Sequence, residues 1–405
     1  MLHLLDVAGA EFAANPWPAY AVLRAGPGLP YDAGFNGHVA SRHADVRAIA
    51  SDRRMVRNPA VFLDPEAVRA LKVRDNFHDM PFHERFVQTS MLDTDGADHD
   101  RLRRAVFPFF TRSRLAHLRG DVARWTGAIL DRLPRDGRID FVADLAAPLP
   151  GQVIGRLIGT DPALVPDLTR WSDQVVSYFD LDRSPAKKRA AESATRRFHD
   201  VLRDLLADRR AHPRDDLASA LLAAEAAGTL SPDETIATLM QLLQAGHGST
   251  IDAMGNGMHA LLTHPDQMAL LRAHPDLMPG AVQEMFRHAA PLPFFHRYAA
   301  EDLHLCGRDW PRGTKFALLY AAANRDPAAF DDPDRFDATR QPNLHLGFGA
   351  GPHVCLGNNL ARLTMETAFA ALLTRFRHLA PAGPFSWKIG LQAHGPVALP
   401  LHVAV

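Results

Sequence analysis

Apolar residues recur with helical spacing along much of this 405-residue chain, and the pattern predicts several helices. Residues 113–133, 185–211 and 215–228 are rich in Ala, Leu and Arg and follow the 3.6-residue period of an α-helix. Residues 15–60 instead mix Pro and Gly with short apolar pieces, which favours short helices and a small sheet. Residues 303–307 alternate toward a turn and predict a strand. The pattern therefore indicates a mainly α protein with a minor β region.

The longest predicted helix begins at Ser231. This residue can cap the N-terminus, Pro232 fits the first turn, and Glu234 completes a capping box. The helix could extend to His264, on the order of 45 Å at 1.5 Å per residue. The glycines within it are Gly246, Gly248, Gly255 and Gly257. Each glycine inside a helix destabilises it by roughly 1 kcal/mol relative to alanine. Four glycines therefore suggest that another segment or a bound molecule comes too close to this helix for larger side chains.

Residues 71–92 are apolar but lack a clean period, and they include Phe77, Phe82 and Phe86. We expect a loop here. Removing the apolar side chains of such a loop from water is favourable in free energy. The loop should therefore pack either on the core or against a bound molecule. The sequence pattern alone leaves both alternatives open.

Composition narrows the class of protein. A hydrophobic content of 47% supports a large core, and length alone allows either several domains or one large one. The net charge of −1 provides no global field to attract nucleic acid or acidic membranes. Two cysteines are too few for a disulfide framework. The first residues carry neither a basic segment nor a long apolar run, so we expect no signal peptide, no membrane anchor and a cytoplasmic location.

One loop carries the strongest candidate chemistry. Glycines at 347, 349 and 351 forbid a regular helix or strand and suit a backbone that approaches something flat. Cys355 follows, and an apolar run from Leu360 to Leu373 then predicts a helix. Free amides and the helix dipole at a helix N-terminus favour a thiolate, which is a soft metal ligand. The alternative is a small buried cysteine in a loop.

The spacing Phe348-x-x-Gly351-x-x-x-Cys355-x-Gly357 resembles the haem-binding loop of the cytochrome P450 family. The resemblance implies one P450 domain over residues 1–405. It also implies haem b between the long central helix and the helix after the loop, with the thiolate of Cys355 as the axial iron ligand. Phe348 and Gly357 would contact the haem, and His353 would meet a haem propionate.

His99 and Arg103 lie four residues apart and would share one face of a helix. By themselves they suggest either two solvated side chains or an anion clamp. The segment resembles the family's His-x-x-x-Arg propionate contact, and Arg297 matches its second propionate arginine. A basic run follows His99, made of Arg101, Arg104, Arg112, Arg114 and Arg119. In the family this region borders the side where an acidic electron donor docks, so the positive charge would speed that encounter.

The segment 245–250 resembles the family's oxygen-binding segment, in which an acid precedes a threonine. Ala245 and Gly246 would border the haem. Gly248 and Ser249 stand where the acid and the threonine are usual, so the carboxylate is missing, and Thr250 lies beside the surviving alcohol. We therefore expect Ser249 and Thr250, with water, to deliver protons.

Glu284 and Arg287 resemble the family's Glu-x-x-Arg motif, with Arg335 as the expected third member of a structural cluster. Residues 388–391 resemble a hairpin whose tip reaches into the pocket. The aromatic candidates for the pocket are Phe82, Phe86, Phe294 and Phe295. Tyr178 and Phe179 are weaker ones. Cys306 lacks a helix start or glycine loop, so we interpret it as structural.

Together these motifs predict a haem-thiolate monooxygenase that inserts one atom of O2 into a small apolar or aromatic substrate, by hydroxylation or O-dealkylation. Because no flavin or iron–sulfur segment is apparent, electrons would come from a ferredoxin-type donor with its reductase. We expect a monomer that binds neither nucleic acid nor membranes. The alternatives are a haem enzyme driven by hydrogen peroxide and a non-enzymatic haem sensor, the latter supported only by the missing carboxylate.

Overall fold

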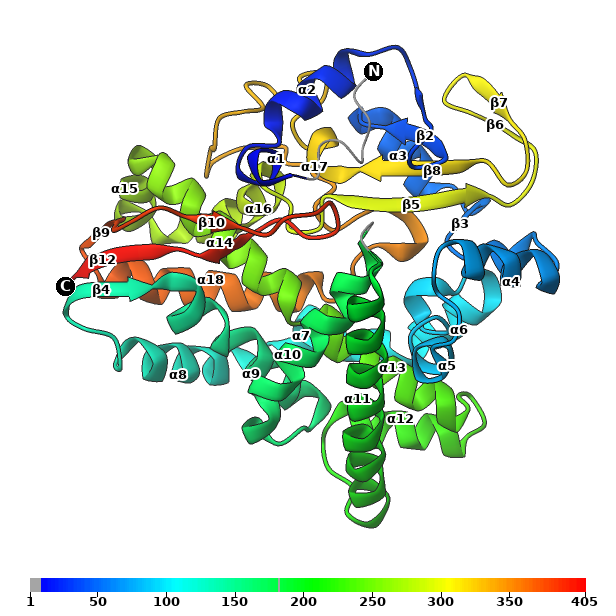
Figure 1. The fold of residues 1–405 in the computed structure, drawn as a ribbon. Coiled ribbons are helices and arrows are strands. Elements are labelled where there is room, and N and C mark those ends of the chain that lie inside the picture. The colour runs from blue at the N-terminus through cyan, green and yellow to red at the C-terminus, as the bar shows by residue number, and fades with distance from the viewer. Residues whose placement is uncertain (1–8, 181–182) are drawn as a thin grey trace.

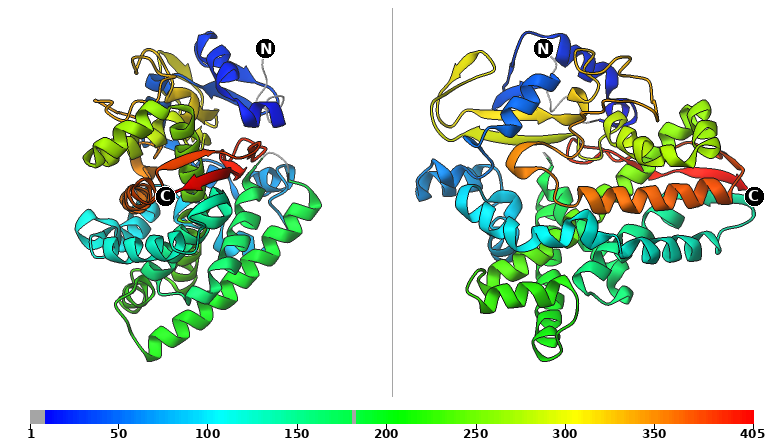
Figure 2. Two further views of the ribbon diagram at one scale, coloured as in Figure 1. Left: turned by 90° about the vertical axis from the view of Figure 1, so that its left-hand side faces the viewer. Right: turned by 180° about the vertical axis from the view of Figure 1, so that it is seen from behind.

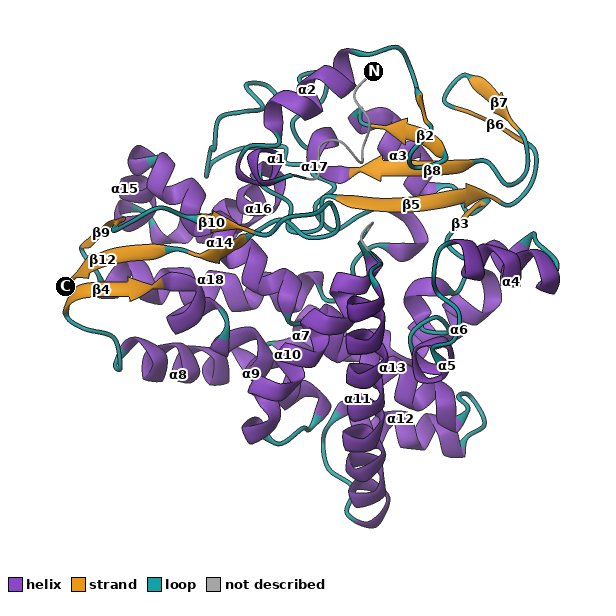
Figure 3. Ribbon diagram, in the orientation of Figure 1, coloured by secondary structure: helices purple, strands orange, loops and turns teal. Residues whose placement is uncertain are grey.

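The computed structural model describes residues 9–180 and 183–405, and helices dominate this part of the chain (Figures 1 and 3). The N-terminal half contains helices α1 (Ala10–Ala14), α2 (Trp17–Ala25), α3 (His43–Ser51), α4 (Pro65–Arg74), α5 (Pro81–Phe86), α6 (Gly96–Val106), α7 (Arg112–Leu115), α8 (Leu118–Leu130), α9 (Pro148–Ile158), α10 (Val165–Val176) and α11 (Pro185–Ala211). The C-terminal half contains helices α12 (Leu217–Ala226), α13 (Pro232–Ala245), α14 (Gly248–Thr263), α15 (Pro265–Ala273), α16 (Met278–His288), α17 (Tyr320–Ala323) and α18 (Asn358–Arg375). The expected mainly α class is confirmed.

The strands are β1 (Tyr31–Asp32), β2 (Gly37–Ala40), β3 (Met55–Val56), β4 (Asp136–Asp140), β5 (Phe294–Ala299), β6 (Leu303–Leu305), β7 (Arg308–Trp310), β8 (Lys315–Leu319), β9 (His378–Pro381), β10 (Ser386–Trp387), β11 (Pro396–Ala398) and β12 (Pro400–Ala404). They gather in two places in Figure 3: β2, β5, β8 and the β6–β7 hairpin at the upper right, and β4, β9 and β12 at the left. The largest sheet has the order β1-β2-β8-β5-β3, and only its β2–β8 pair is parallel. A second sheet has the order β4-β12-β9, and β6–β7 and β10–β11 form separate hairpins.

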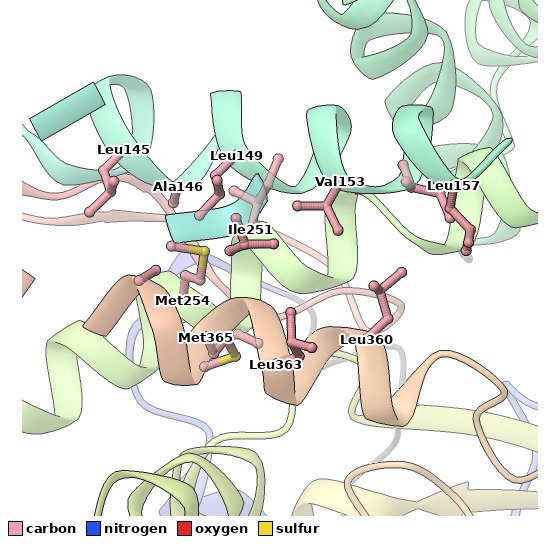
Figure 4. Packing of buried hydrophobic residues seen from close by; sticks show 14 of the residues in the cluster. Leu145, Ala146, Leu149, Val153, Leu157, Ile251, Met254, Leu360, Leu363 and Met365 are labelled. Carbon is pink, nitrogen blue, oxygen red and sulfur yellow. The ribbon is translucent and has the colours of Figure 1, made fainter. Parts of the chain in front are cut away.

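The core lies where helices from the middle and the end of the chain meet. Figure 4 shows Leu149 and Val153 of α9, Ile251 and Met254 of α14, and Leu363 of α18 converging on one another. Figure 2 shows α18, in orange, running alongside α8. Burial of these side chains holds α14 between α9 and α18, because each fully buried aliphatic side chain stabilises the fold by roughly 1.5–3 kcal/mol.

The predicted central helix is broken. Its capping box at Ser231 and Glu234 is present, but α13 ends at Ala245 and α14 begins at Gly248. The Ile154 side chain fills the space beside Gly246, where a Cβ atom would lie 2.9 Å from it. His247 leaves the helix axis with φ −108° and ψ −78°, and its Nε2 atom lies 2.8 Å from Thr169 Oγ1 of α10. The expected continuous helix is therefore wrong at this one point.

Residues 71–92 are also more ordered than the sequence pattern indicates. They contain the end of α4, the whole of α5 and the start of a short 3₁₀ turn at Met91–Asp93. The Pro81 at the start of α5 sets the first helical turn, and Phe86 at its end is buried in the core. Elsewhere, the helix predicted over residues 113–133 is divided into α7 and α8, whereas the other expected helices and the strand at residues 303–305 are confirmed within a few residues of their predicted ends. In the described part of the chain, every helix is too short or too polar to cross a membrane.

Candidate active site

One cavity of about 1460 Å³, part of it open to solvent, lies between the α13–α14 break and the loop that precedes α18. Its lining comes from segments that are far apart in sequence: the turn at residues 91–93, helix α6, strand β5 and the cysteine loop at residues 347–357. The described residues that line it include no Asp or Glu. An anion or a largely apolar group therefore fits this cavity better than a cation does.

The cysteine loop holds Cys355 by its backbone. The amide of Cys355 donates to the carbonyl of Phe348 at 2.8 Å. Gly351 has φ +68°, and a Cβ atom there would collide with the backbone of Ala50 and Ser51. Glycine at 351 is thus required both by backbone conformation and by the close approach of α3.

Burial raises the pKa of the Cys355 thiol, while the amides of Gly357 and Asn358 and the guanidinium of Arg103 act in the opposite direction. The helix start that the sequence predicts is present, since α18 begins at Asn358 with Gly357 as its N-cap. The effect of burial exceeds that of these donors, so the pKa of the thiol stays above its usual value. A metal cation bound at the sulfur would supply the missing stabilisation, because a coordinating thiol is deprotonated outright.

The four predicted propionate residues, His99, Arg103, Arg297 and His353, all line this cavity. Arg297 is 3% exposed and its Nη1 donates to the carbonyl of His296 at 2.9 Å. Among the described residues its buried Nε atom has no hydrogen-bond partner, and no carboxylate lies within ion-pair distance. A buried guanidinium without an anion is costly, so this end of the cavity fits a bound carboxylate.

The neighbouring histidines have protein partners. The His99 and His353 rings lie 4.3 Å apart, and His353 Nε2 lies 3.0 Å from Asp95 Oδ1. Asp95 also accepts from the amides of Arg57 and Asn58 at 2.9 and 2.8 Å. Desolvation raises the pKa of Asp95, but His353 and these amides outweigh it and leave the pKa below its usual range. Sequence reasoning missed Asp95 because its partners lie 37 to 258 positions away.

The α13–α14 break forms another part of the lining. Ala245, Gly246, Ser249 and Thr250 all contribute to it, as predicted. Ser249 Oγ donates to the carbonyl of Ala245 at 2.9 Å, which satisfies its proton in the structure. Both hydroxyls are thus at the cavity, and their role in proton delivery stays a prediction.

Of the predicted aromatic pocket residues, only Phe295 lines the cavity. Phe294 lies on the opposite face of β5 and packs against Phe35, with ring centroids 5.6 Å apart. Phe82 and Phe86 contact His199 instead. Successive residues of a strand point to opposite faces, so the sequence already contained the signal that Phe294 and Phe295 could not both face the cavity.

Aliphatic side chains make up the rest of the apolar lining, and sequence reasoning missed most of them. They include Met91, Leu92, Val153, Leu242, Pro291 and Leu292. Residues 388–391 lie outside the lining, and Lys388 instead pairs with Asp252 at 2.8 Å. Tyr178 and Phe179 also lie outside it, with Tyr178 buried against Phe77.

The Glu-x-x-Arg pair forms a buried ion pair, with Arg287 Nε 2.7 Å from Glu284 Oε2 and both side chains fully buried. The prediction that the Arg335 side chain is the third member of this cluster is wrong. Arg335 is exposed and contributes its backbone carbonyl, which accepts from Arg287 at 2.9 Å. The side chain of Arg340 reaches Glu284 instead, at 3.1 Å.

Comparison with known proteins places this geometry in a family. The family model described as Cytochrome P450 matches residues 169–386. The chain is 34% identical to 6-deoxyerythronolide B hydroxylase of Saccharopolyspora erythraea, with all of both chains covered. It is 38% identical to vitamin D(3) 25-hydroxylase of Pseudonocardia autotrophica, over 93% of this chain and 90% of that one.

Solved structures agree. The myxobacterial cytochrome P450 CYP267B1 in complex with myristic acid superimposes with a TM-score of 0.89 at 32% identity, with 99% of each chain covered. The family model spans more than half of the chain, and a named relative aligns along its whole length. The chain therefore belongs to the cytochrome P450 family, whose members are oxidoreductases that bind haem through a cysteine thiolate.

Proposed function

We propose that this protein is a monooxygenase that inserts one oxygen atom of O2 into a C–H bond of a small apolar or aromatic molecule. In the balanced reaction, a substrate C–H bond, O2, two electrons and two protons give an alcohol and water. Bound haem supplies the redox chemistry on O2. The observation that carries the proposal is a single cavity that brings Cys355 together with the hydroxyls of Ser249 and Thr250.

The chain's own residues would hold the haem at both its centre and its edge. Cys355 would provide the sulfur ligand, with the amide of Gly357 oriented toward that sulfur. Arg297 and Arg103 would donate to the propionates, since Arg297 is buried without an anion and Arg103 already donates to the carbonyl of Val354 at 2.8 Å. His353, held by Asp95, would support the same carboxylates.

The lining supports an apolar substrate. Met91, Leu92, Leu242, Leu292 and Phe295 form a mostly aliphatic surface around the space left beside the haem residues. Two relatives are named hydroxylases, and one structural neighbour holds myristic acid. Hydroxylation of an aliphatic C–H bond therefore has more support than O-dealkylation of an aromatic ether.

We propose that a ferredoxin-type protein, served by its own reductase, delivers the electrons on the side of Cys355. Arg101, Arg114 and Arg119 of the predicted basic run are held by acidic partners: Glu234, Asp215 and Glu366 respectively. Arg104 and Arg112 are exposed, and Phe107 between them is 53% exposed. An apolar centre with basic surroundings is suited to an acidic donor.

The proposed unit is a monomeric P450 domain over residues 1–405. The relative with full-length coverage and the structural neighbour with 99% coverage support one domain rather than several. A monomer remains the simplest assembly for an enzyme whose cavity is completed by its own chain.

A second candidate function is the same oxygen insertion with hydrogen peroxide as the oxidant. The observation that favours it is the absence of a carboxylate from the described cavity lining. Peroxide already carries the two electrons and two protons that the O2 reaction needs. A non-enzymatic haem sensor has less support, because the named relatives are hydroxylases.

The decisive experiment compares the two cysteines. We expect the reduced protein with carbon monoxide to show the thiolate-type absorption band, and Cys355→His to abolish it. Cys306→Ala is the matched control, because Cys306 lies in the β6–β7 turn. NADH oxidation with a ferredoxin and ferredoxin reductase, compared with product formation from added peroxide, then separates the two oxidants. Loss of the band in Cys306→Ala would overturn the ligand assignment.

A further inference from the structure

The position that lacks an acid faces a carboxylate from another helix. A Cβ atom built on Gly248 would lie 3.6 Å from Asp173 Oδ1, in ordinary van der Waals contact, and among the described residues no other heavy atom lies within 4 Å of it apart from its chain neighbours and the backbone of its own helix. Gly248 has no positive φ, so its backbone conformation does not require glycine. Asp173 lies on α10, which packs against the start of α14.

The Asp173 side chain is accessible to solvent, and the protein around it also partly desolvates its carboxylate. The residue is exposed, yet the protein around it raises the pKa of its carboxyl, and Lys388 acts in the opposite direction. Lys388 makes its direct contacts to Asp252, at 2.8 and 3.1 Å. Lys388 of the β10–β11 connection and Asp252 of α14 act on Asp173 through their charges, and His247 at the break contacts Thr169, one turn earlier on the same helix.

These groups carry one positive charge for two carboxylates. Burial raises the pKa of Asp252 to about 6 despite its bonds to Lys388. Burial also lowers the pKa of His247 to about 4, so this ring is neutral near pH 7. One ammonium cannot neutralise both acids, so the carboxyl groups of this cluster take up a proton more readily than isolated ones do.

We infer that Asp173 is the carboxyl that relays protons from solvent, across Gly248, to Ser249 and Thr250 at the cavity. This inference rests on the proposed function, because each turnover with O2 consumes two protons. In each relay step the Ser249 hydroxyl leaves the Ala245 carbonyl, accepts the proton that Asp173 releases and passes on its own, and water reprotonates Asp173. Asp173 acts through Ser249 and does not itself line the cavity.

Asp252 is less suited to this role. It is 1% exposed, both of its oxygens contact Lys388, and its side chain fills the space where a Cβ of Gly395 would lie. A carboxylate enclosed in this way cannot exchange protons with water quickly. Asp173 combines access to water with proximity to the break, which are the two properties that a relay needs.

The test moves the carboxylate between the two helices. Asp173→Asn removes the acid without changing its shape, and the double variant Asp173→Asn with Gly248→Asp restores an acid on α14, where there is room for a side chain. The matched control is Asp167→Asn, on the same helix, where an exposed aspartate pairs with Arg170. Haem content and the urea unfolding midpoint verify that each variant is folded.

Two readouts are used. The infrared spectrum of the resting protein reports protonated carboxyl groups, and we expect Asp173→Asn to lose one carboxyl band that titrates with pH and shifts in D2O. The NADH oxidation rate, measured across pH with a ferredoxin, ferredoxin reductase and myristic acid as the probe, should fall on the order of 10²-fold in Asp173→Asn. The double variant should recover most of the lost NADH oxidation rate. Asp167→Asn should match the wild type in both readouts.

The outcomes are distinguishable from failure of the proposed function. A wild-type protein without the thiolate-type band or NADH turnover would overturn that function, and the infrared readout would still test Asp173. A wild type that turns over, with Asp173→Asn equal to it in rate and pH profile, would overturn the relay alone. An unchanged carboxyl band in Asp173→Asn would overturn it as well. A loss of rate that the double variant does not restore would assign Asp173 a structural role and reject the relay.

Discussion

One carboxylate, Glu284, organises the segment that follows β8. Its oxygens accept from Arg287 at 2.7 Å, from Arg340 at 3.1 Å, from the Asn343 amide at 3.0 Å and from the backbone of Asp337 at 2.9 Å. The side chain is fully buried. Removing one partner from such a network leaves a buried charge uncompensated, which typically costs 3–5 kcal/mol.

We therefore expect Glu284→Gln to lower the free energy of unfolding by about 3–5 kcal/mol, because Arg287 and Arg340 lose their counter-charge. Arg335→Ala, which keeps the backbone carbonyl, should change it by less than about 0.5 kcal/mol. Urea unfolding of the haem-loaded proteins measures both. Equal destabilisation by the two variants would restore Arg335 to the cluster and contradict the structure.

The sequence could predict the pair Glu284–Arg287 but not its third member. Three residues of spacing on a helix define a shared face, so the first contact is local. Arg335 and Arg340 lie in an irregular segment without a period. Which of two arginines points back to Glu284 depends on the path of that loop, and short sequence motifs contain no information on it.

At the cavity, Arg297 offers a test of haem retention. Hydrogen bonds to charged groups contribute roughly 1.5–3 kcal/mol, and tenfold in an equilibrium constant corresponds to about 1.4 kcal/mol. We expect Arg297→Leu to release haem to apomyoglobin about 10- to 100-fold faster. The control, Arg308→Leu, removes an exposed arginine from the β6–β7 hairpin. Identical release rates would exclude a propionate contact for Arg297.

Helix α14 shows how element packing selects residues. Hairpin β10–β11 lies on it, and a Cβ atom at Gly255 would lie 2.5 Å from Pro396 Cγ. At Gly257 a Cβ would lie 2.5 Å from Met285 Sδ of α16. The close approach that the glycines predict is thus confirmed at Gly246, Gly255 and Gly257, whereas Gly248 has room for a side chain. Sequence alone cannot separate these cases, because the neighbours come from segments up to 141 positions away.

This difference predicts opposite outcomes for two glycine substitutions. Gly255→Ala should destabilise the protein by about 1–3 kcal/mol, because the hairpin must move off α14. Gly248→Ala should leave stability unchanged or raise it by up to about 1 kcal/mol, since alanine loses less backbone entropy in a helix. Thermal unfolding of the two variants beside the wild type provides the measurement. Destabilisation by Gly248→Ala would mean that Asp173 tolerates no methyl group beside it.

At the scale of the whole molecule, the site depends on segments that sequence order keeps apart. Arg103 and Arg297 reach one cavity from α6 and β5, which have almost 200 residues between them. Recognition of short motifs in family order was enough to predict the fold class, and the residues proposed to hold haem line one cavity. It could not predict the roles inferred for Asp95 and Asp173, because these rest on contacts across the fold and not on their neighbours in sequence.

Buried histidines make the whole molecule sensitive to acid. Four of these histidines lie outside the cavity lining and are not adjacent to Cys355. Burial lowers the pKa of His83 and His345 to about 3 and the pKa of His247 and His394 to about 4. In the unfolded chain each would titrate near 6.5. As the pH falls below 6.5, the unfolded state binds protons that the folded state does not, so stability is lost. Asp252 acts in the opposite sense, because its pKa of about 6 lets the folded state take up a proton first.

The magnitudes decide which effect dominates. Between pH 6.5 and 5, each of these histidines removes about 1.6 kcal/mol, whereas Asp252 returns about 1.2 kcal/mol. Four histidines therefore outweigh one aspartate, and the net loss approaches the total stability of a typical protein, 5–15 kcal/mol. We expect the urea midpoint to fall steeply from pH 7 to pH 5. His83→Gln should reduce the slope, because a neutral amide has no proton to gain, while the exposed control His212→Gln should not. A midpoint independent of pH across this range would show that the buried imidazoles acquire their protons without unfolding.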